Sequence, residues 1–456
     1  MKRRLLALLL VCGAVSLAPR ALAMDPVYII APNGSLPADL AEMVAAAGGT
    51  LYRVFPEIGY ASAISANPDF AANLEASNKI RGVQEDVPVQ MTPTLQLWGI
   101  GTAGVSPEAA SQAAAAASPA GAFFFPCQWN LQQVDVPGAW AQGKLGSPSV
   151  KVAVLDSGID PNHIDLAGRV DLANSTSFLS PDSSACGPAD EQTITDLLWH
   201  GSFVAGIITS NNLGVASVAP LTQVVAVKVI NCTNFGLFVD WIRGILYAAN
   251  LPDVDVINMS LQAIFPKSFG NGVIGAAFNK AVNFAQNQGK IVVSAAGNFG
   301  VNLDKDRNFL ELPAQAGAGI AAWSGDIDGN LSSFSNHGRT GTWVGAGGGD
   351  FTPVTPSIPI PGCVLPSFAQ DGIISVCAST GIFGCGTSSF LFGATGTSFS
   401  APIVTGVAAL VDGMNGGSLR PGQIKTILSN TADDLGPGGV DNIFSHGRVN
   451  AGRAVQ

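Results

Sequence analysis

The stretch VKVAVLD, residues 150–156, decides how the chain folds. It is a continuous apolar run that ends in an acid. Similar runs follow as QVVAVKV (223–229), VDVINMS (254–260) and KIVVSAAG (290–297), and segments with helical spacing lie between them. Continuous apolar strands that alternate with helices predict an α/β fold of three layers, in which helices cover both faces of a mostly parallel sheet.

In such a sheet, functional residues gather beyond the carboxyl ends of the strands. Asp156, Ser260 and Asn298 stand at such ends and are the first candidates. A carboxylate at the end of a buried strand is costly unless it is paired or accepts hydrogen bonds. The alternative for Asp156 is an ordinary role in capping a turn.

Two helix starts add a histidine and a serine. WHGSFVAGII places His200 at a helix start, where Gly201 permits close approach, and GTSFSAPIVTGVAAL does the same for Ser398. Pro402 fits only near such a beginning, and the helix dipole favours negative charge near Ser398. A structural histidine and an N-capping serine are the alternatives. Together with Asp156, however, these residues supply every group that a serine nucleophile needs, in a known chain order.

Several motifs together resemble the subtilisin-like serine peptidases. They are VAVLDSGID, HGSFVAGII, INMSL, VVSAAGN and GTSFSAP, in that order, with FSNHG at 334–338. The resemblance covers about residues 127–456 and implies a secreted serine endopeptidase with a subtilisin-like fold. It implies catalytic roles for Asp156, His200 and Ser398. Asn298 matches the amide that stabilises the oxyanion. Ser400 stands where the family usually has alanine, so we interpret it as a small helix residue.

The resemblance also implies a cleft for polypeptide substrates, bounded by two walls and by an edge that pairs with an extended peptide. Its residues are Ser260, Leu261 and Gln262 on one wall, Ala295, Ala296 and Gly297 on the other, and Asn234, Phe235 and Gly236 at the edge. Gln262 replaces the usual glycine. We predict that its side chain narrows or re-polarises the pocket.

The first residues have the order of a secretory signal peptide. MKRR is followed by the apolar run LLALLLVCGAVSLA and an A-x-A site that ends at Ala23, which predicts export to the periplasm or the medium. A membrane helix is the alternative, but the run is shorter than the roughly 20 residues needed to span. No later stretch is long and apolar enough, so we expect no membrane span.

Residues 24–91 suggest the element order β-α-β-β-α-β of a small ferredoxin-like α+β fold. This region resembles the family's inhibitory propeptide, so the chain's own propeptide is an expected intramolecular partner. Residues 92–122 are rich in Ala, Ser, Gly and Pro and predict an exposed linker, with an Ala-rich helix as the alternative. The peptidase domain is then 123–456, and maturation lies between about Met91 and Phe123.

Charge and cysteines narrow the function further. The net charge is −10 and the chain has no basic cluster, which argues against nucleic-acid binding. We also expect the protein to be a monomer. Beyond the signal peptide the cysteines are Cys127, Cys186, Cys232, Cys363, Cys377 and Cys385. An even number in an exported chain suggests disulfides. We favour Cys186–Cys232 and a local pair among the last three, with free buried cysteines as the alternative.

Some features depart from the family. Phe203 and Ile403 replace two usual histidines, and we predict that they face each other in the core. Enlarged loops at 171–196 and 339–390 should border the cleft, although plain surface loops are the alternative.

We expect the chemistry to need no cofactor. Structural calcium is common in the family, but the loop SNNLGVASVAP looks short for it, and we assign no metal site.

Two other functions are open. An esterase or lipase would need G-x-S-x-G, which GTSFS breaks at its fifth position. A non-catalytic binding module on a peptidase scaffold is the second alternative. Intact Asp156, His200, Ser398 and Asn298 argue against it.

Overall fold

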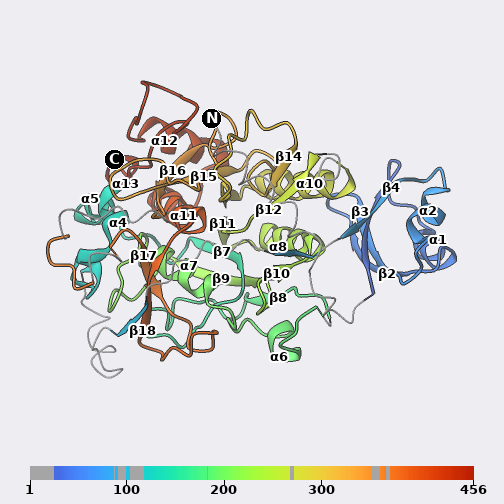
Figure 1. Cartoon of the computed structure of the whole chain (residues 1–456), viewed down its shortest axis with the longest axis horizontal. Helices are drawn as coiled ribbons and strands as arrows, with labels where there is room; N and C mark the ends of the chain where they lie inside the picture. Colours follow the sequence, from blue (N-terminus) through green and yellow to red (C-terminus); the bar gives the residue numbers. More distant parts are fainter. Residues whose placement is uncertain are drawn as a thin grey trace, which may run out of the picture.

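The structure is a computed structural model that describes residues 25–86, 88–90, 99–102, 118–181, 183–267, 272–350, 360–365 and 370–456. The predicted signal peptide lies outside these residues. Figure 1 shows a small N-terminal unit, in blue, at one end of a much larger unit. We refer to residues 25–86 as the N-terminal unit and to the described residues from 118 on as the large unit.

The N-terminal unit has the predicted β-α-β-β-α-β order and an antiparallel sheet of order β2-β3-β1-β4. Successive residues of β1 point to opposite faces. Tyr28 and Ile30 belong to the unit's own core, whereas Val27 and Ile29 join the core of the large unit. The sheet therefore docks through one face. The elements are β1 (Val27–Pro32), α1 (Leu40–Ala46), β2 (Thr50–Phe55), β3 (Tyr60–Ile64), α2 (Phe70–Glu75) and β4 (Ile80–Asp86).

The large unit is built on a seven-stranded parallel sheet, which confirms the predicted fold class. Its order is β16-β15-β13-β11-β7-β9-β8. The four apolar runs form four neighbouring strands, and their side chains are buried on both faces. The strands are β7 (Lys151–Asp156), β8 (Thr176–Ser177), β9 (Gln223–Lys228), β11 (Val254–Met259), β13 (Ile291–Ala295), β15 (Ile320–Gly325) and β16 (Val344–Gly347).

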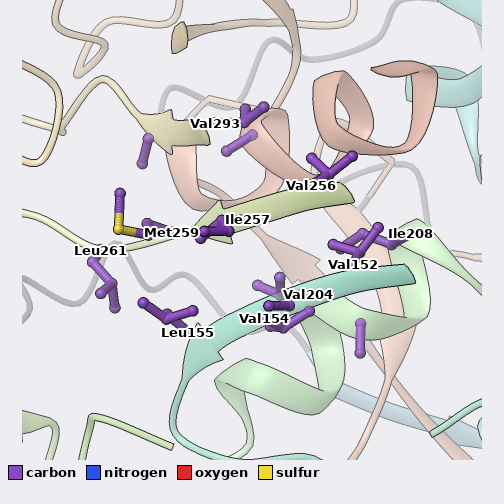
Figure 2. Packing of buried hydrophobic residues seen from close by; sticks show 14 of the residues in the cluster. Val152, Val154, Leu155, Val204, Ile208, Val256, Ile257, Met259, Leu261 and Val293 are labelled. Atoms are coloured by element: carbon purple, nitrogen blue, oxygen red, sulfur yellow. The ribbon is translucent and has the colours of Figure 1, made fainter. Parts of the chain in front are cut away.

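Helices cover both faces of this sheet. Figure 2 shows Val152 and Val154 of β7 near Val204 and Ile208 of α7. The next residue, Leu155, points the other way, where a Cβ on Gly244 of α8 would lie 3.3 Å from it. The helices are α4 (Trp129–Gln133), α5 (Val136–Ala141), α6 (Pro188–Glu191), α7 (His200–Ile208), α8 (Phe238–Asn250), α10 (Val273–Asn287), α11 (Thr397–Met414), α12 (Pro421–Asn430) and α13 (Ala451–Ala454).

Short strands link the segment after the N-terminal unit to the large unit. β5 (Val89–Gln90) pairs antiparallel with β10 (Phe235–Gly236). β6 (Gly99–Thr102) pairs with β18 (Ser389–Ala394), which also pairs with β17 (Ile373–Val376). The predicted linker is therefore not irregular throughout, because backbone pairing holds its first part. The Ala-rich stretch lies outside the described residues. A further pair joins β12 (Ala263–Pro266) to β14 (Phe309–Leu312).

The six cysteines form three disulfides, Cys127–Cys363, Cys186–Cys232 and Cys377–Cys385. Both favoured pairings are confirmed, and the alternative of free cysteines is wrong. Among the described residues, α11 is long and apolar enough to cross a membrane, but 89% of that stretch is buried inside the protein. Its hydrophobicity is that of a core helix.

Candidate active site

The candidate residues meet where the central strands end. Asp156 closes β7, Ser260 follows β11, and Asn298 follows β13. The first turns of α7 and α11 bring His200 and Ser398 to the same edge of the sheet. Since parallel strands end at a common edge, this gathering is what the sequence predicted.

His200 and Asp156 form a buried pair. His200 Nδ1 lies 2.8 Å from Oδ1 and 3.0 Å from Oδ2 of Asp156. The Ser157 N–H also donates to Asp156 Oδ1 at 2.7 Å. A Cβ on Gly201 would lie 2.1 Å from the Gly158 carbonyl oxygen and 3.1 Å from Asp156 Cβ. Only glycine fits there, so Gly201 permits the approach of α7 to the end of β7.

A second buried acid, Asp196, was not identified from the sequence. Its carboxylate accepts hydrogen bonds from the Trp199 N–H at 2.8 Å, and from the N–H and hydroxyl of Ser202 at 2.8 and 2.7 Å. It therefore caps α7. Trp199, just before His200, has a φ of 139°, a conformation rare for a side-chain-bearing residue. Strain of this kind persists where surrounding contacts enforce it, often at functional sites.

The electrostatics of His200 follow from these acids. Burial is the largest single effect and lowers the pKa of His200. The charge and hydrogen bond of Asp156 and the charge of Asp196 oppose it, and together they raise this pKa above its ordinary value of 6.5. The imidazole is thus prepared to hold a proton next to Asp156.

Ser398 lies in the first turn of α11, beside the end of β11. Its hydroxyl donates to the Ser260 carbonyl oxygen at 3.2 Å, and the Ser260 hydroxyl donates to the Ser398 carbonyl oxygen at 2.8 Å. Within the described part of the chain, no hydrogen bond joins Ser398 to His200. Phe399 connects the two helices, because its ring centroid lies 5.7 Å from that of His200.

Ser400 has a different environment. It is fully buried, its hydroxyl donates to the Trp323 carbonyl oxygen, and it accepts from the Ala346 N–H at 3.2 Å. It thus joins α11 to β15 and β16. This contact with the core fits the interpretation of Ser400 as a structural helix residue.

Asn298 is held by both sides of the site. Its Oδ1 accepts hydrogen bonds from the N–H of Thr397 at 2.9 Å and from the hydroxyl of Thr397 at 2.8 Å. Its backbone N–H donates to Gln262 Oε1 at 2.8 Å. Because the carbonyl end of the amide faces Thr397, the donor end points away from α11. Thr397 is a positioning residue that the sequence analysis missed.

The predicted cleft edge is occupied. Phe235 and Gly236 form β10, which pairs with β5 of the chain's own N-terminal region, and Asn234 precedes them with a φ of 68°. Gln262 is only 4% exposed and points inward, towards the Asn298 backbone. β10 thus pairs with an extended segment of the same chain, and Gln262 reaches from one predicted wall to the residue after the other. The roles of these residues in binding a substrate stay predictions.

Both enlarged loops reach the surroundings of His200. In the insertion, the N–H and hydroxyl of Ser379 donate to Asp160 at 2.8 and 2.6 Å, and Thr380 donates to the Asp196 carbonyl oxygen at 2.9 Å. The Phe383 ring lies 5.9 Å from that of Trp199. The loop 171–196 supplies Asp196 itself. These loops therefore border the site rather than lying elsewhere on the surface.

Within the described residues, no group of three or more His, Cys, Asp or Glu is placed to hold a metal ion. The loop that looked short for calcium is held by a carboxylate. Asp165 accepts hydrogen bonds from the N–H groups of Leu213, Gly214 and Val215 at 2.7, 2.9 and 2.9 Å. Protein donors thus satisfy the acid at this loop.

Comparison with known proteins agrees with this geometry. The model of the subtilase family, Peptidase_S8, matches residues 147–447. The chain belongs to the subtilase family. Thermitase from Thermoactinomyces vulgaris is 29% identical over 337 residues, which cover 73% of this subtilase and 98% of thermitase. Subtilisin BL from Lederbergia lenta is 31% identical over 330 residues, 72% of this chain and 98% of that one.

The fold extends the likeness beyond the large unit. The crystal structure of the epidermin leader peptide processing serine protease from Staphylococcus aureus has a TM-score of 0.75 at 20% identity. The alignment covers 94% of this subtilase and 98% of that chain. The N-terminal unit is therefore part of a shared architecture.

In this subtilase Phe203 packs on Phe399 with ring centroids 4.7 Å apart. A direct contact of Phe203 with Ile403 stays a prediction.

Proposed function

We propose that this serine endopeptidase is exported as a precursor and cuts itself, and that Asp156, His200 and Ser398 are its catalytic triad. The observation that carries the proposal is the buried His200–Asp156 pair, which lies at the same sheet edge as Ser398 and Asn298. The three disulfides suit an oxidising compartment.

The chemistry follows from the positions of these groups. Ser398 Oγ attacks the substrate carbonyl carbon while His200 Nε2 takes the hydroxyl proton. Asp156 holds the imidazole through Nδ1 and stabilises the imidazolium that forms. His200 then gives the proton to the leaving amine, which departs and leaves an acyl-enzyme. Water, activated by His200, releases the acid and restores Ser398.

Two adjustments complete the site during reaction. The Ser398 hydroxyl turns from the Ser260 carbonyl towards His200, a change that is common because catalytic hydrogen bonds tighten in the substrate complex. The Asn298 amide, fixed through Thr397, donates to the oxyanion as charge develops on it. No step requires a cofactor, and we assign no role to calcium.

The N-terminal unit is proposed to be the inhibitory propeptide. β5 pairs with the edge where an extended substrate is expected, and β6 pairs with β18 of the large unit. The chain is held on the large unit on both sides of residues 91–98, by β5 and by β6, so we place the maturation cut between these two strands. The cut would leave β6 on the mature enzyme, which we expect to be a monomer acting on polypeptides and not on nucleic acid.

N-terminal sequencing of secreted wild type and Ser398→Ala tests this proposal. The wild type should hydrolyse casein and start within residues 91–99, whereas Ser398→Ala should keep its propeptide and leave casein intact. Ser400→Ala is the matched control and should behave as wild type. A processed Ser398→Ala secreted by a host without other proteases would contradict self-cleavage.

The rival functions give different results in the same assays. An esterase would turn over an ester substrate but no peptide. A binding module would do neither. The family assignment, and the position of Asn298 that Thr397 fixes, support peptide hydrolysis over both rivals.

A further inference from the structure

Two polar side chains connect the walls of the predicted pocket for the substrate residue before the cut bond. Gln262, at the end of one wall, reaches across to the Asn298 N–H that follows the other wall. Glu311, on β14, lies against Gly297 of the second wall, where a Cβ would be 2.8 Å from the Glu311 Cδ. Since β14 pairs with β12, which continues the first wall, Glu311 lies next to both walls.

The Glu311 carboxyl is buried and only partly satisfied. It is 2% exposed, and its Oε2 accepts a hydrogen bond from Asn336 Nδ2 at 3.3 Å. The same Asn336 amide donates to the Ala296 carbonyl oxygen at 2.9 Å, so it ties Glu311 to the second wall. Among the described residues, Oε1 of Glu311 has no hydrogen-bond partner.

Burial raises the pKa of Glu311 to about 8, and the Asn336 amide and the Ala263 N–H lower it by less. At neutral pH the group is therefore mostly an uncharged acid. An uncharged carboxyl both donates and accepts hydrogen bonds. It offers no negative charge to a cationic substrate side chain.

Within the described residues, Gln262 has an unpaired hydrogen-bond donor, whereas the unpaired atom of Glu311 is an oxygen that can accept. Its Oε1 is used by Asn298, whereas its Nε2, a donor, has no partner in the described part of the chain, although the side chain is 4% exposed. Leaving a buried polar group without a hydrogen-bond partner destabilises the protein. Both unsatisfied groups belong to residues beside the walls of the predicted pocket, so a substrate side chain that enters between the walls can pair with them.

We propose that this pocket selects an amide side chain, glutamine or asparagine, on the amino side of the cut bond. This inference rests on the proposed function. The substrate amide oxygen accepts from Gln262 Nε2, and the substrate amide nitrogen donates to Glu311 Oε1. An apolar side chain leaves both groups unpaired. A glutamate brings an unpaired negative charge into a buried site, which is costly. A lysine or arginine supplies no acceptor for Gln262 and requires Glu311 to ionise.

The precursor sequence agrees with this assignment. No lysine or arginine occurs between Arg81 and Lys144, a stretch that includes the proposed maturation segment. Self-cleavage in residues 91–98 therefore cannot depend on a basic residue. A pocket for uncharged side chains is compatible with processing there.

The test uses processed enzyme and peptides that differ only in the residue before the cut bond: glutamine, asparagine, glutamate, methionine, leucine and lysine. Methionine and glutamate match glutamine in size. At pH 7, kcat/KM for the better amide peptide should exceed that for each non-amide peptide by about tenfold or more, because such a pocket rejects analogues that leave its groups unpaired. Equal or faster cleavage of the glutamate, methionine, leucine or lysine peptide would overturn the inference.

Variants locate the preference. Gln262→Met and Glu311→Met should each reduce the glutamine-to-methionine ratio to about one, through loss of the selected hydrogen bond. Gln128→Met is the matched control, because this buried glutamine pairs both ends of its amide with Ala216. It should keep the wild-type ratio, and an unchanged ratio in both pocket variants would contradict the assignment.

Fluorophosphonate titration distinguishes failure of this inference from failure of the proposed function. An enzyme that is not labelled contradicts the proposed function, whereas a labelled enzyme without amide preference contradicts only this inference.

Discussion

The N-terminal unit and the large unit are held together in different ways. The large unit has a continuous apolar core, which the docked face of the N-terminal sheet joins, and it also has three disulfides and a fully buried ion pair between Lys228 and Asp190. The N-terminal unit has a small core of its own, and the ion pair that it contains, Lys79 with Asp39, is exposed. This difference fits the proposal that the large unit is the stable part of the protein and that the N-terminal unit dissociates from it after cleavage.

The contact between the units supports this division. Gln84 and Asp86, two residues apart on β4, each accept hydrogen bonds at a helix start of the large unit. Gln84 accepts from the Ile274 N–H at 3.0 Å, and Asp86 accepts from the Phe238 and Val239 N–H groups at 3.0 and 2.7 Å. After release, water can replace these bonds. Substitutions in the large unit should thus change stability or turnover, and substitutions at the contact should change retention.

The largest expected effect is on the stability of the large unit. Lys228→Met leaves the buried Asp190 carboxylate without its cation, 2.5 Å away, and removes a donor to the Thr195 carbonyl oxygen. We expect a loss of about 3–5 kcal/mol. Lys79→Met removes a pair that solvent screens, so its effect on stability should be far smaller. Thermal midpoints in the Ser398→Ala background, which prevents self-digestion, measure both, and equal shifts would contradict the contrast.

The next effect is on turnover alone. Asn298→Ala removes the side chain that Thr397 positions, so we expect kcat to fall roughly 10²–10³-fold with little change in KM. Steady-state kinetics of the processed enzyme test this. A loss confined to KM would show that Asn298 binds substrate instead.

The strands of the sheet could be predicted from the sequence, whereas the roles of several buried acids could not. The apolar runs that form β7 and β11 predicted the sheet, and a triad requires particular residue types at strand and helix ends, so Asp156, His200 and Ser398 could be found. Asp86 and Glu311 could not. Their partners are backbone N–H groups or side chains distant in sequence, and only the tertiary structure brings them together.

The same limitation explains two other findings. β6, in the stretch GIGT, has no apolar alternation, and it forms a strand because β18 offers a free edge. Asp165 was one acid among many, and its three backbone partners lie about fifty residues away in the loop that it holds. Local patterns predict elements, but they do not reveal which loop reaches which carboxylate.

A smaller effect concerns pH and the contact between the units. Burial raises the pKa of Asp86 from 3.8 to about 7 in the docked state, and the N–H donors of Val239 and Phe238 lower it by less. On release the group regains its ordinary pKa, so the docked state holds more protons between about pH 4 and 7. Docking should therefore weaken as pH rises through this window and level off above it.

Retention of the cleaved propeptide measures this effect. From pH 5 to pH 7.5 we expect the dissociation constant to rise roughly tenfold or more, since one pKa unit corresponds to about 1.4 kcal/mol. Asp86→Asn removes the titrating group and should flatten this dependence. A dependence that is equally steep in Asp86→Asn would assign it to another group.

The smallest expected effect is that of metal removal. Asp165 accepts hydrogen bonds from three N–H groups of the loop at Leu213–Val215, so we expect this loop to need no metal ion. Chelation by EDTA should therefore shift the thermal midpoint of the large unit by less than about 2 °C. A shift of roughly 10 °C or more, reversed by added calcium, would show that a metal ion stabilises this unit.

The central claim is that Ser398 is the nucleophile of a site that the large unit completes by itself. Labelling of processed enzyme with a fluorophosphonate, followed by peptide mass mapping, tests it most directly. We predict a single adduct, on Ser398, that is absent in His200→Ala and present in Ser400→Ala. An adduct on another serine, or no adduct on enzyme that has lost its propeptide, would contradict the account.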